Sequence, residues 1–242
     1  MARLLKTWVA DPSVCAYLPH QHSSMEYRLM VDVDPDELDK LLERGWRRFG
    51  PAYFRPKCRG CRECVPLRVP VADFKPSKQQ RRCWNKRDRF STELGTPQID
   101  DERIELYDLW HADRAERRGW DGDRIDAVQY YHQFAFPHLS IRELSFRDAE
   151  TSRLVAVAIV DETPRAFSAV YTFHHPDYRA YSLGTLAILE QIECARRSNK
   201  PMVYLGYRVR DCASSVYKAK FRPHELMVRW SEMDEPPEWR RL

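Results

Sequence analysis

The sequence predicts an α+β protein in two parts, a small basic domain with several cysteines over residues 1–92 and a larger domain over 93–242. Three observations predict this organisation. A hydrophobic fraction of 43% with 12% aromatic residues is that of a chain that buries a core. Basic residues gather in the first part, since residues 44–89 contain 15 Lys or Arg against 3 Asp or Glu. Helical and strand-like patterns alternate in the second part, after a polar linker expected at 91–98.

The N-terminal domain is expected to begin with an irregular polar stretch, followed by a strand at 26–33. The next segment, "DPDELDKLLERGW", predicts a helix that begins at Pro35 and is capped by Asp34 and Glu37. Gly45 suits the left-handed conformation in which helices often end.

An extended segment and a basic helix complete this domain. Pro66 and Pro70 lie in the extended segment 65–74, and because proline cannot donate a backbone hydrogen bond, they disfavour a place inside a sheet. The stretch "SKQQRRCWNKRDRF" then predicts a strongly basic helix that is capped by Ser77 and Gln80.

The second part has the pattern of two helices, three strands, a helix, a strand, a short helix and a last strand. The three strands, at 139–146, 153–162 and 166–173, are separated by short polar turns and predict an antiparallel meander. This order of elements is that of the acetyltransferase-like (GNAT-type) fold, in which a loop and the following helix hold the acyl donor. Here the loop "YRAYSLGTLA" contains Gly184 alone, so few backbone N–H groups are free to close on the pyrophosphate of coenzyme A.

The stretch "RPKCRGCRECVPLR" places Cys58, Cys61 and Cys64 at strict three-residue spacing. A structural zinc site needs four ligands, and either Cys15 or Cys83 is available as the fourth. An iron–sulfur loop of the ferredoxin type is the second alternative, although its fourth cysteine before proline is missing in "CVPLR". The third is a set of reduced thiols without metal.

Composition also bears on the cellular compartment of the protein and on its partners. No apolar run reaches the roughly 18–20 residues of a membrane span, and the N-terminus is a poor signal peptide, so no membrane partner is expected. Seven cysteines, an odd number, favour reduced thiols and a cytoplasmic protein. The concentrated positive charge predicts a face that meets a polyanion, with nucleic acid the first candidate and a merely solvated face the alternative.

Several motifs carry a resemblance to a known family. "CAYLP", "LLERGWRRFGPAYFRPKCRGCRECVPLRV" and "FKPSKQQRR" resemble the N-terminal domain of aminoacyl-tRNA–protein transferases, and "SAVYTFHHPDYRAYSLGTLAILEQI", "VYLGYRV" and "YKAKFRPHEL" resemble their catalytic domain. The cysteine arrangement is similar to that of the bacterial branch, which implies leucyl transfer from Leu-tRNA to proteins with N-terminal Asp or Glu, marking them for proteolysis. The resemblance favours Cys15 as the fourth ligand of any metal and implies no cofactor for the chemistry itself. It does not indicate the oligomeric state.

The C-terminal motifs supply the expected catalytic residues. Aminolysis of an ester needs alignment, oxyanion stabilisation and help for the leaving ribose oxygen rather than a covalent intermediate. Residues in these motifs that suit such roles are Tyr171, Ser182, Gly184, Thr185, Tyr207, Tyr217 and Lys218. A carboxylate at the acceptor terminus needs a cation, and the candidates are Arg208, Arg210, Lys218, Lys220 and Arg222.

The basic segment supplies the expected tRNA contacts. Its candidates are Arg47, Arg48, Arg59, Arg62, Lys78, Arg81, Arg82, Lys86, Arg87 and Arg89. Arg47 and Arg48 follow Trp46, so bracing of the fold is an equal alternative for them. Trp84 is a candidate for stacking on an unpaired base, with a place in the core as the alternative.

Three other functions stay open at this point. An arginyl-tRNA–protein transferase differs from the leucyl type only in its donor pocket. A small-molecule N-acyltransferase that uses coenzyme A is disfavoured by the single glycine of the loop. A non-catalytic RNA-binding protein with a metal knuckle leaves the C-terminal motifs without a role.

Overall fold

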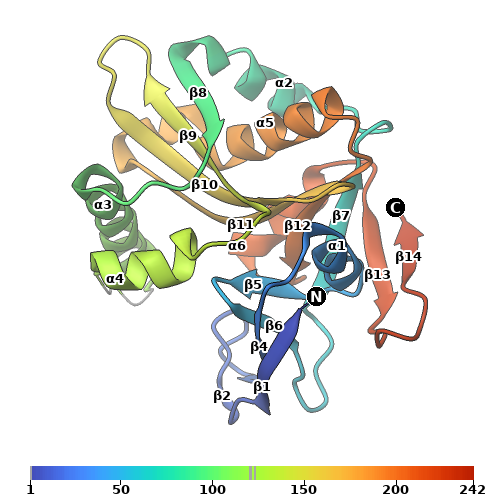
Figure 1. The fold of residues 1–242 in the computed structure, drawn as a ribbon. Coiled ribbons are helices and arrows are strands. Elements are labelled where there is room, and N and C mark those ends of the chain that lie inside the picture. Colours follow the sequence, from blue (N-terminus) through green and yellow to red (C-terminus); the bar gives the residue numbers. More distant parts are fainter. Residues whose placement is uncertain (1, 120–121, 123) are drawn as a thin grey trace.

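A computed structural model describes residues 2–119, 122 and 124–242 and shows a mixed α/β fold with one large sheet (Figure 1). This sheet has eight strands, and most neighbouring pairs are antiparallel. In spatial order the strands are β14 (Glu238–Arg241), β13 (Glu225–Arg229), β7 (Val65–Pro70), β12 (Met202–Arg208), β11 (Ala166–His174), β10 (Leu154–Glu162), β9 (Ile141–Asp148) and β8 (Phe90–Gly95). The predicted meander is confirmed as β9, β10 and β11.

Helices cover both faces of the large sheet. The helical elements are α1 (Pro35–Glu43), α2 (Lys78–Trp84), η1 (Arg87–Arg89), α3 (Asp101–Arg118), α4 (Ala127–Tyr130), η2 (Tyr131–Ala135), η3 (Pro176–Tyr181), α5 (Leu183–Arg197), α6 (Ala213–Val216) and η4 (Tyr217–Lys220). Strand β10 explains the layering, because successive side chains of a strand point to opposite faces. Its Ala158 and Val160 join the core under α5, whereas Val157 and Ile159 join the core under α3.

A small sheet lies beside the large one. Its order is β1 (Arg3–Val9), β4 (Met25–Val31), β6 (Ala52–Pro56) and β5 (Arg47–Phe49), and a two-stranded ribbon, β2 (Ser13–Val14) with β3 (His22–Ser23), flanks it. Helix α1 has the predicted capping box, and its apolar stripe is buried in a core that also holds Trp46 and Tyr204 of β12. That core therefore joins the two sheets.

The structure corrects the prediction for the proline-containing segment. Strand β7 lies inside the large sheet, between β12 and β13. Pairing with β13 involves only Leu67 and Arg68, so neither Pro66 nor Pro70 has to donate a hydrogen bond on that side. The sheet thus tolerates both prolines because one of the two ladders is short.

The sequence analysis missed seven strands: β1, β2, β3, β5, β6, β8 and β14. The stretch expected to be irregular contains β1, and the end of the chain adds β14 beyond the last predicted strand. The linker expected at 91–98 is wrong over most of its length, since β8 occupies Phe90–Gly95 at the edge of the large sheet. The predicted division into 1–92 and 93–242 stays a prediction, and β7 and β8 make the two parts share one sheet.

Candidate functional site

The candidate site lies where β11 and β12 separate. These parallel strands pair only through 166–168 of β11 and 202–204 of β12. At the next residue the carbonyl oxygen of Ala169 accepts a hydrogen bond from the Arg47 guanidinium instead of from a neighbouring strand. The divergence leaves room for a cavity of about 490 Å³ at the start of α5.

This cavity brings together five residues that the sequence analysis proposed for catalysis: Tyr171, Ser182, Gly184, Thr185 and Tyr217. They come from β11, the start of α5 and η4, segments that are separate in the chain. His174 also lines the cavity, and sequence reasoning missed a further part of the lining, which includes Trp110, Arg114, Arg118 and Arg179. A signal for it existed in the four-residue spacing of 110, 114 and 118 on α3, which places these side chains on one face.

The first turn of α5 is open towards the cavity. Ser182 adopts a left-handed conformation and makes no side-chain capping bond, so the helix start is not closed by its own residue. A Cβ atom built on Gly184 would meet no other atom within 4 Å, so this glycine is not required by packing. The N-terminal end of a helix attracts negative charge, and here it faces free space.

Tyr171 and Tyr217 both line this cavity and carry protonated hydroxyls. The hydroxyl of Tyr171 lies 3.0 Å from Nε2 of His111, which fixes its position. Burial raises the pKa of Tyr171 and also that of Tyr217, so both hydroxyls stay protonated at neutral pH. A protonated hydroxyl can donate to an oxyanion or to a leaving oxygen.

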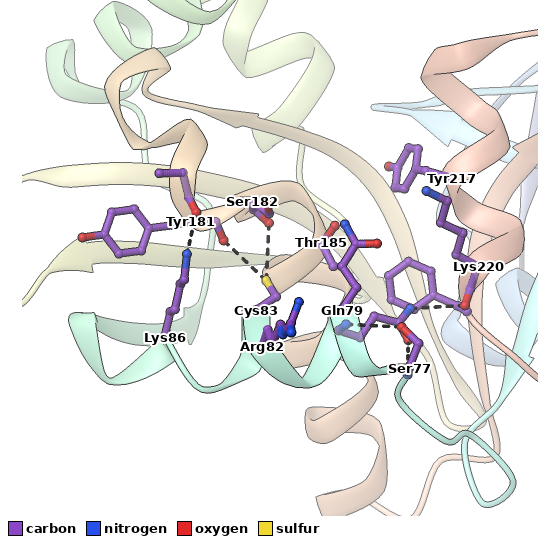
Figure 2. A pocket seen from close by; sticks show the side chains of 13 residues that line it. Ser77, Gln79, Arg82, Cys83, Lys86, Tyr181, Ser182, Thr185, Tyr217 and Lys220 are labelled. Carbon is purple, nitrogen blue, oxygen red and sulfur yellow. Dashed lines mark hydrogen bonds between the residues drawn. The ribbon is translucent and has the colours of Figure 1, made fainter.

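A second cavity, of about 210 Å³, lies beside the basic helix α2 (Figure 2). The two cavities share Ser182, Thr185 and Tyr217 as lining residues. Arg82 and Lys86 of α2 and Lys220 of η4 line the second cavity as cations. The predicted capping box of α2 is present, which gives this helix a defined start beside the site. The expected tRNA-contacting helix and the expected catalytic residues are therefore neighbours.

Helix α2 and the residues just after it present exposed cations, as a phosphate-contacting surface requires. These cations are Lys78, Arg81, Arg82 and Lys86. The Lys86 ammonium also donates to the carbonyl oxygen of Ala180 at 2.9 Å. Arg87 is half-buried with its guanidinium 4.9 Å from the ring centroid of Trp84. Trp84 is itself packed against the main core, which leaves less of its ring for a base.

Arg48 does not lie on that surface. It is buried and forms an ion pair with the buried Asp161, and it donates to the carbonyl oxygen of Gly50 at 3.0 Å. Arg47 is half-buried at the divergence of β11 and β12. The alternative that these two arginines brace the fold matches their placement, because their guanidinium groups are already used inside the protein.

Two of the proposed catalytic residues are placed away from the cavity. The Tyr207 hydroxyl points to the small sheet and donates to the carbonyl oxygen of Gly45 at 3.0 Å. The Lys218 ammonium donates to the carbonyl oxygen of Tyr207 at 3.2 Å, and burial lowers the pKa of Lys218 to about 8. The remaining cations have different positions: Arg208 is half-buried, Arg210 and Arg222 are exposed, and Lys220 lines the second cavity.

The cysteines form a loose group without ligand geometry. A cavity of about 270 Å³ is lined by Cys58, Cys61 and Cys64, and Cys64 also packs against an apolar cluster that contains Cys15 and Cys212. Burial, with further contributions from the neighbouring thiols, raises the pKa of Cys64 to about 12, so it is a protonated thiol in this arrangement. Within the described residues, no three His, Cys, Asp or Glu side chains converge as metal ligands. As placed, the thiols do not fit a metal ion or cluster.

Comparison with known families agrees with the motifs. The model of the arginine-tRNA-protein transferase C terminus matches residues 102–228, and that of the N terminus matches residues 13–82. The chain belongs to this transferase family. The site at the start of α5 lies in the part that matches the C-terminal transferase model, and the basic helix α2 lies mostly in the part that matches the N-terminal one.

Curated members of the transferase family include close relatives of this chain. The aspartate/glutamate leucyltransferase of Pseudomonas putida is 36% identical over 236 residues, covering 93% of this chain and 96% of its own length. The enzyme of the same name from Campylobacter jejuni is 33% identical over 222 residues, covering 91% and 92%. Among solved structures, the C-terminal domain of a protein described as a lysylphosphatidylglycerol synthetase from Agrobacterium fabrum matches with a TM-score of 0.48 and 15% identity, covering 86% of this chain and 64% of that one. In the described part of the chain, every helix is too short or too polar to cross a membrane.

Proposed function

We propose that this chain transfers leucine from Leu-tRNA to the α-amino group of proteins that begin with Asp or Glu. The names of its curated relatives support this function. The observation in the structure that supports it best is that the cavity lined by cations of α2 and the cavity at the start of α5 share lining residues. One surface holds a polyanion, and the adjoining cavity is large enough for the acylated 3′ end of that polyanion.

The proposed reaction is a direct aminolysis. The α-amine has an ordinary pKa of about 8, so a substantial fraction is neutral near pH 7 and attacks the ester carbonyl carbon without a strong base. The carbon–nitrogen bond forms, the bond to the ribose oxygen breaks, and the amine proton ends on that oxygen. The hydroxyls of Tyr171 and Tyr217 and the first-turn N–H groups of α5 are the donors that stabilise the oxyanion and the leaving oxygen. Ser182, Gly184 and Thr185 shape the donor end of the site.

The tRNA is proposed to lie along α2. Lys78, Arg81, Arg82 and Lys86 present exposed cations there, and Lys220 adds one beside Tyr217. Such contacts bind phosphates without reading sequence, so discrimination between donors rests on the aminoacyl group and the 3′ end. Leucine as the donor follows from the relatives' names and is the part that an experiment has to settle first.

Three finer features belong to the proposal. The catalytic part is of the GNAT type, with the divergence of β11 and β12 as its donor cleft. The N-terminal part is a cysteine-containing domain that binds tRNA. A metal at Cys15, Cys58, Cys61 and Cys64 has no role in this chemistry. Its existence is tested by measuring zinc, iron and sulfide in the purified wild type and in Cys15→Ser; equal, near-zero contents exclude it.

The test of the function uses purified protein, radiolabelled Leu-tRNA or Arg-tRNA, and peptides that begin with Asp, Glu, Lys or Ala. The proposal expects label on the Asp and Glu peptides from Leu-tRNA alone. Label from Arg-tRNA alone identifies the arginyl type instead. Absence of transfer from either tRNA contradicts an aminoacyltransferase.

A further inference from the structure

We propose that Arg114, held flat against Trp110 on α3, binds the side-chain carboxylate of the acceptor's N-terminal Asp or Glu. This inference rests on the proposed function and names the residue that selects acidic acceptors. Arg114 and Trp110 both line the main cavity, whose lining also includes the first residues of α5.

The side chain of Arg114 is pre-positioned for an anion. Its guanidinium carbon lies 3.7 Å from the ring centroid of Trp110, so the planar group is stacked and fixed. Trp110 is itself fixed, since it is buried and its ring lies 4.2 Å from that of His174. A stacked guanidinium keeps its N–H edge free for a bidentate bond to a carboxylate.

Arg114 also lacks a partner for its charge. Within the described residues it forms no ion pair, and its buried Nε has no hydrogen-bond acceptor. The nearby carboxylate, Asp113, is already paired with Arg179. Burial lowers the pKa of Arg114, and Arg118, Arg117 and Arg179 lower it further, whereas the Asp113 carboxylate raises it. An unpaired cation among like charges is stabilised by an anion from outside the chain.

The position of Arg114 suits the geometry of the acceptor. Arg114 lines the same cavity as Tyr171 and Tyr217, the residues proposed to face the ester. In an N-terminal Asp, only the Cα and Cβ atoms separate the α-amine from the carboxylate carbon, and Glu adds one methylene. A carboxylate held by Arg114 therefore directs the amine towards the tyrosine hydroxyls.

The donor and the acceptor then enter from different sides. Cations of α2 and Lys220 border the side shared with the second cavity, where the tRNA is proposed to lie. Arg114 and Arg118 line the main cavity and do not belong to the lining of the second cavity. Lys220, one of the cations first considered for the acceptor, belongs to the donor side in this arrangement, and Arg222 is exposed beyond it.

The test compares the wild type with Arg114→Gln, Arg114→Lys and the control Arg117→Gln, which removes an exposed arginine of the same helix. Loss of a hydrogen-bonded charge pair predicts a roughly 10- to 100-fold fall in kcat/KM for Asp and Glu peptides. The KM for the peptide rises and the KM for Leu-tRNA stays constant. Arg114→Lys recovers part of the loss, because it keeps the charge but not the planar fork. Arg117→Gln stays within about twofold of the wild type.

Arg114→Glu provides a second test, because it reverses the charge that is proposed to bind the acceptor side chain. The proposal expects preference to shift from peptides that begin with Asp to those that begin with Lys. If Arg114→Gln raises the KM for Leu-tRNA and leaves that for the Asp peptide unchanged, Arg114 serves the donor and the inference is wrong. Failure of the wild type to transfer leucine to any peptide overturns the proposed function itself, and the two outcomes are therefore distinct.

Discussion

Replacement of Arg48 by Met tests whether this arginine braces the fold or contacts tRNA. Arg48 and Asp161 are 3% and 1% exposed and form an ion pair between β5 and β10. Met fills a similar volume but leaves the Asp161 carboxylate buried without its partner. Breaking a buried pair in this way costs about 3–5 kcal/mol of unfolding free energy. For a chain of this size, that corresponds to a fall of roughly 6–20 °C in Tm.

The assay measures thermal and urea unfolding together with the KM for Leu-tRNA. The double variant Arg48→Met/Asp161→Leu should recover most of the lost stability, because it removes the unpaired charge as well. Below its lowered melting temperature, Arg48→Met should keep a normal KM for tRNA. A variant that melts like the wild type but binds tRNA weakly would refute the reasoning and restore Arg48 to the tRNA surface.

Three further predictions address the tRNA surface, a displaced catalytic candidate and a buried amine. Charge reversal at Arg81 and Arg82 should raise the KM for Leu-tRNA and reduce the log–log slope of binding against salt by about 0.7–0.9 per lost phosphate contact. The control Arg240→Glu, which changes an exposed arginine, should leave both the KM and the slope unchanged. An unaltered slope for the Arg81 and Arg82 variant would show that tRNA binds at another surface. Tyr207→Phe should lose about 1 kcal/mol of unfolding free energy and keep its kcat, because the tyrosine hydroxyl that is removed donates to the Gly45 carbonyl oxygen. A large fall in kcat at normal stability would contradict this placement of Tyr207. Burial lowers the pKa of Lys218 from 10.5 to about 8, so between these values the unfolded chain holds more protons than the folded one. The unfolding free energy of the wild type should therefore rise with pH relative to Lys218→Met between pH 8 and 10, and parallel pH profiles would show that the amine is not buried.

Local signals in the sequence predicted much of the fold. The capping boxes at Asp34 and Ser77 appear as expected, since each depends on residues only three positions apart. The meander followed from alternating patterns and short turns. The prediction that β7 does not lie inside a sheet was wrong because its prolines are accommodated by a short ladder with β13. That partner lies about 160 positions later in the chain.

The candidate site was predictable only in part, for the same reason. Tyr171, Gly184 and Tyr217 belong to recognisable motifs, and the structure gathers them around one cavity. Tyr207 belongs to an equally clear motif, yet its hydroxyl faces the small sheet, and no sequence pattern reports which of two sheets a side chain faces. Arg114 was missed because its four-residue spacing from Trp110 is found on any helix face. Only the packing of α3 beside β11 shows that the stacked pair lines the cavity.

The most direct test of the account is leucyl transfer by Gly184→Val. The site requires free space above Gly184, where a Cβ atom would meet nothing within 4 Å, and Val costs a helix no more than Gly does. The wild type and the control Gly95→Val should transfer leucine from Leu-tRNA to an Asp peptide. Gly184→Val, with an unchanged melting temperature, should lose most of this activity. Transfer by Gly184→Val at the rate of the wild type would contradict the assignment of this cavity as the active site.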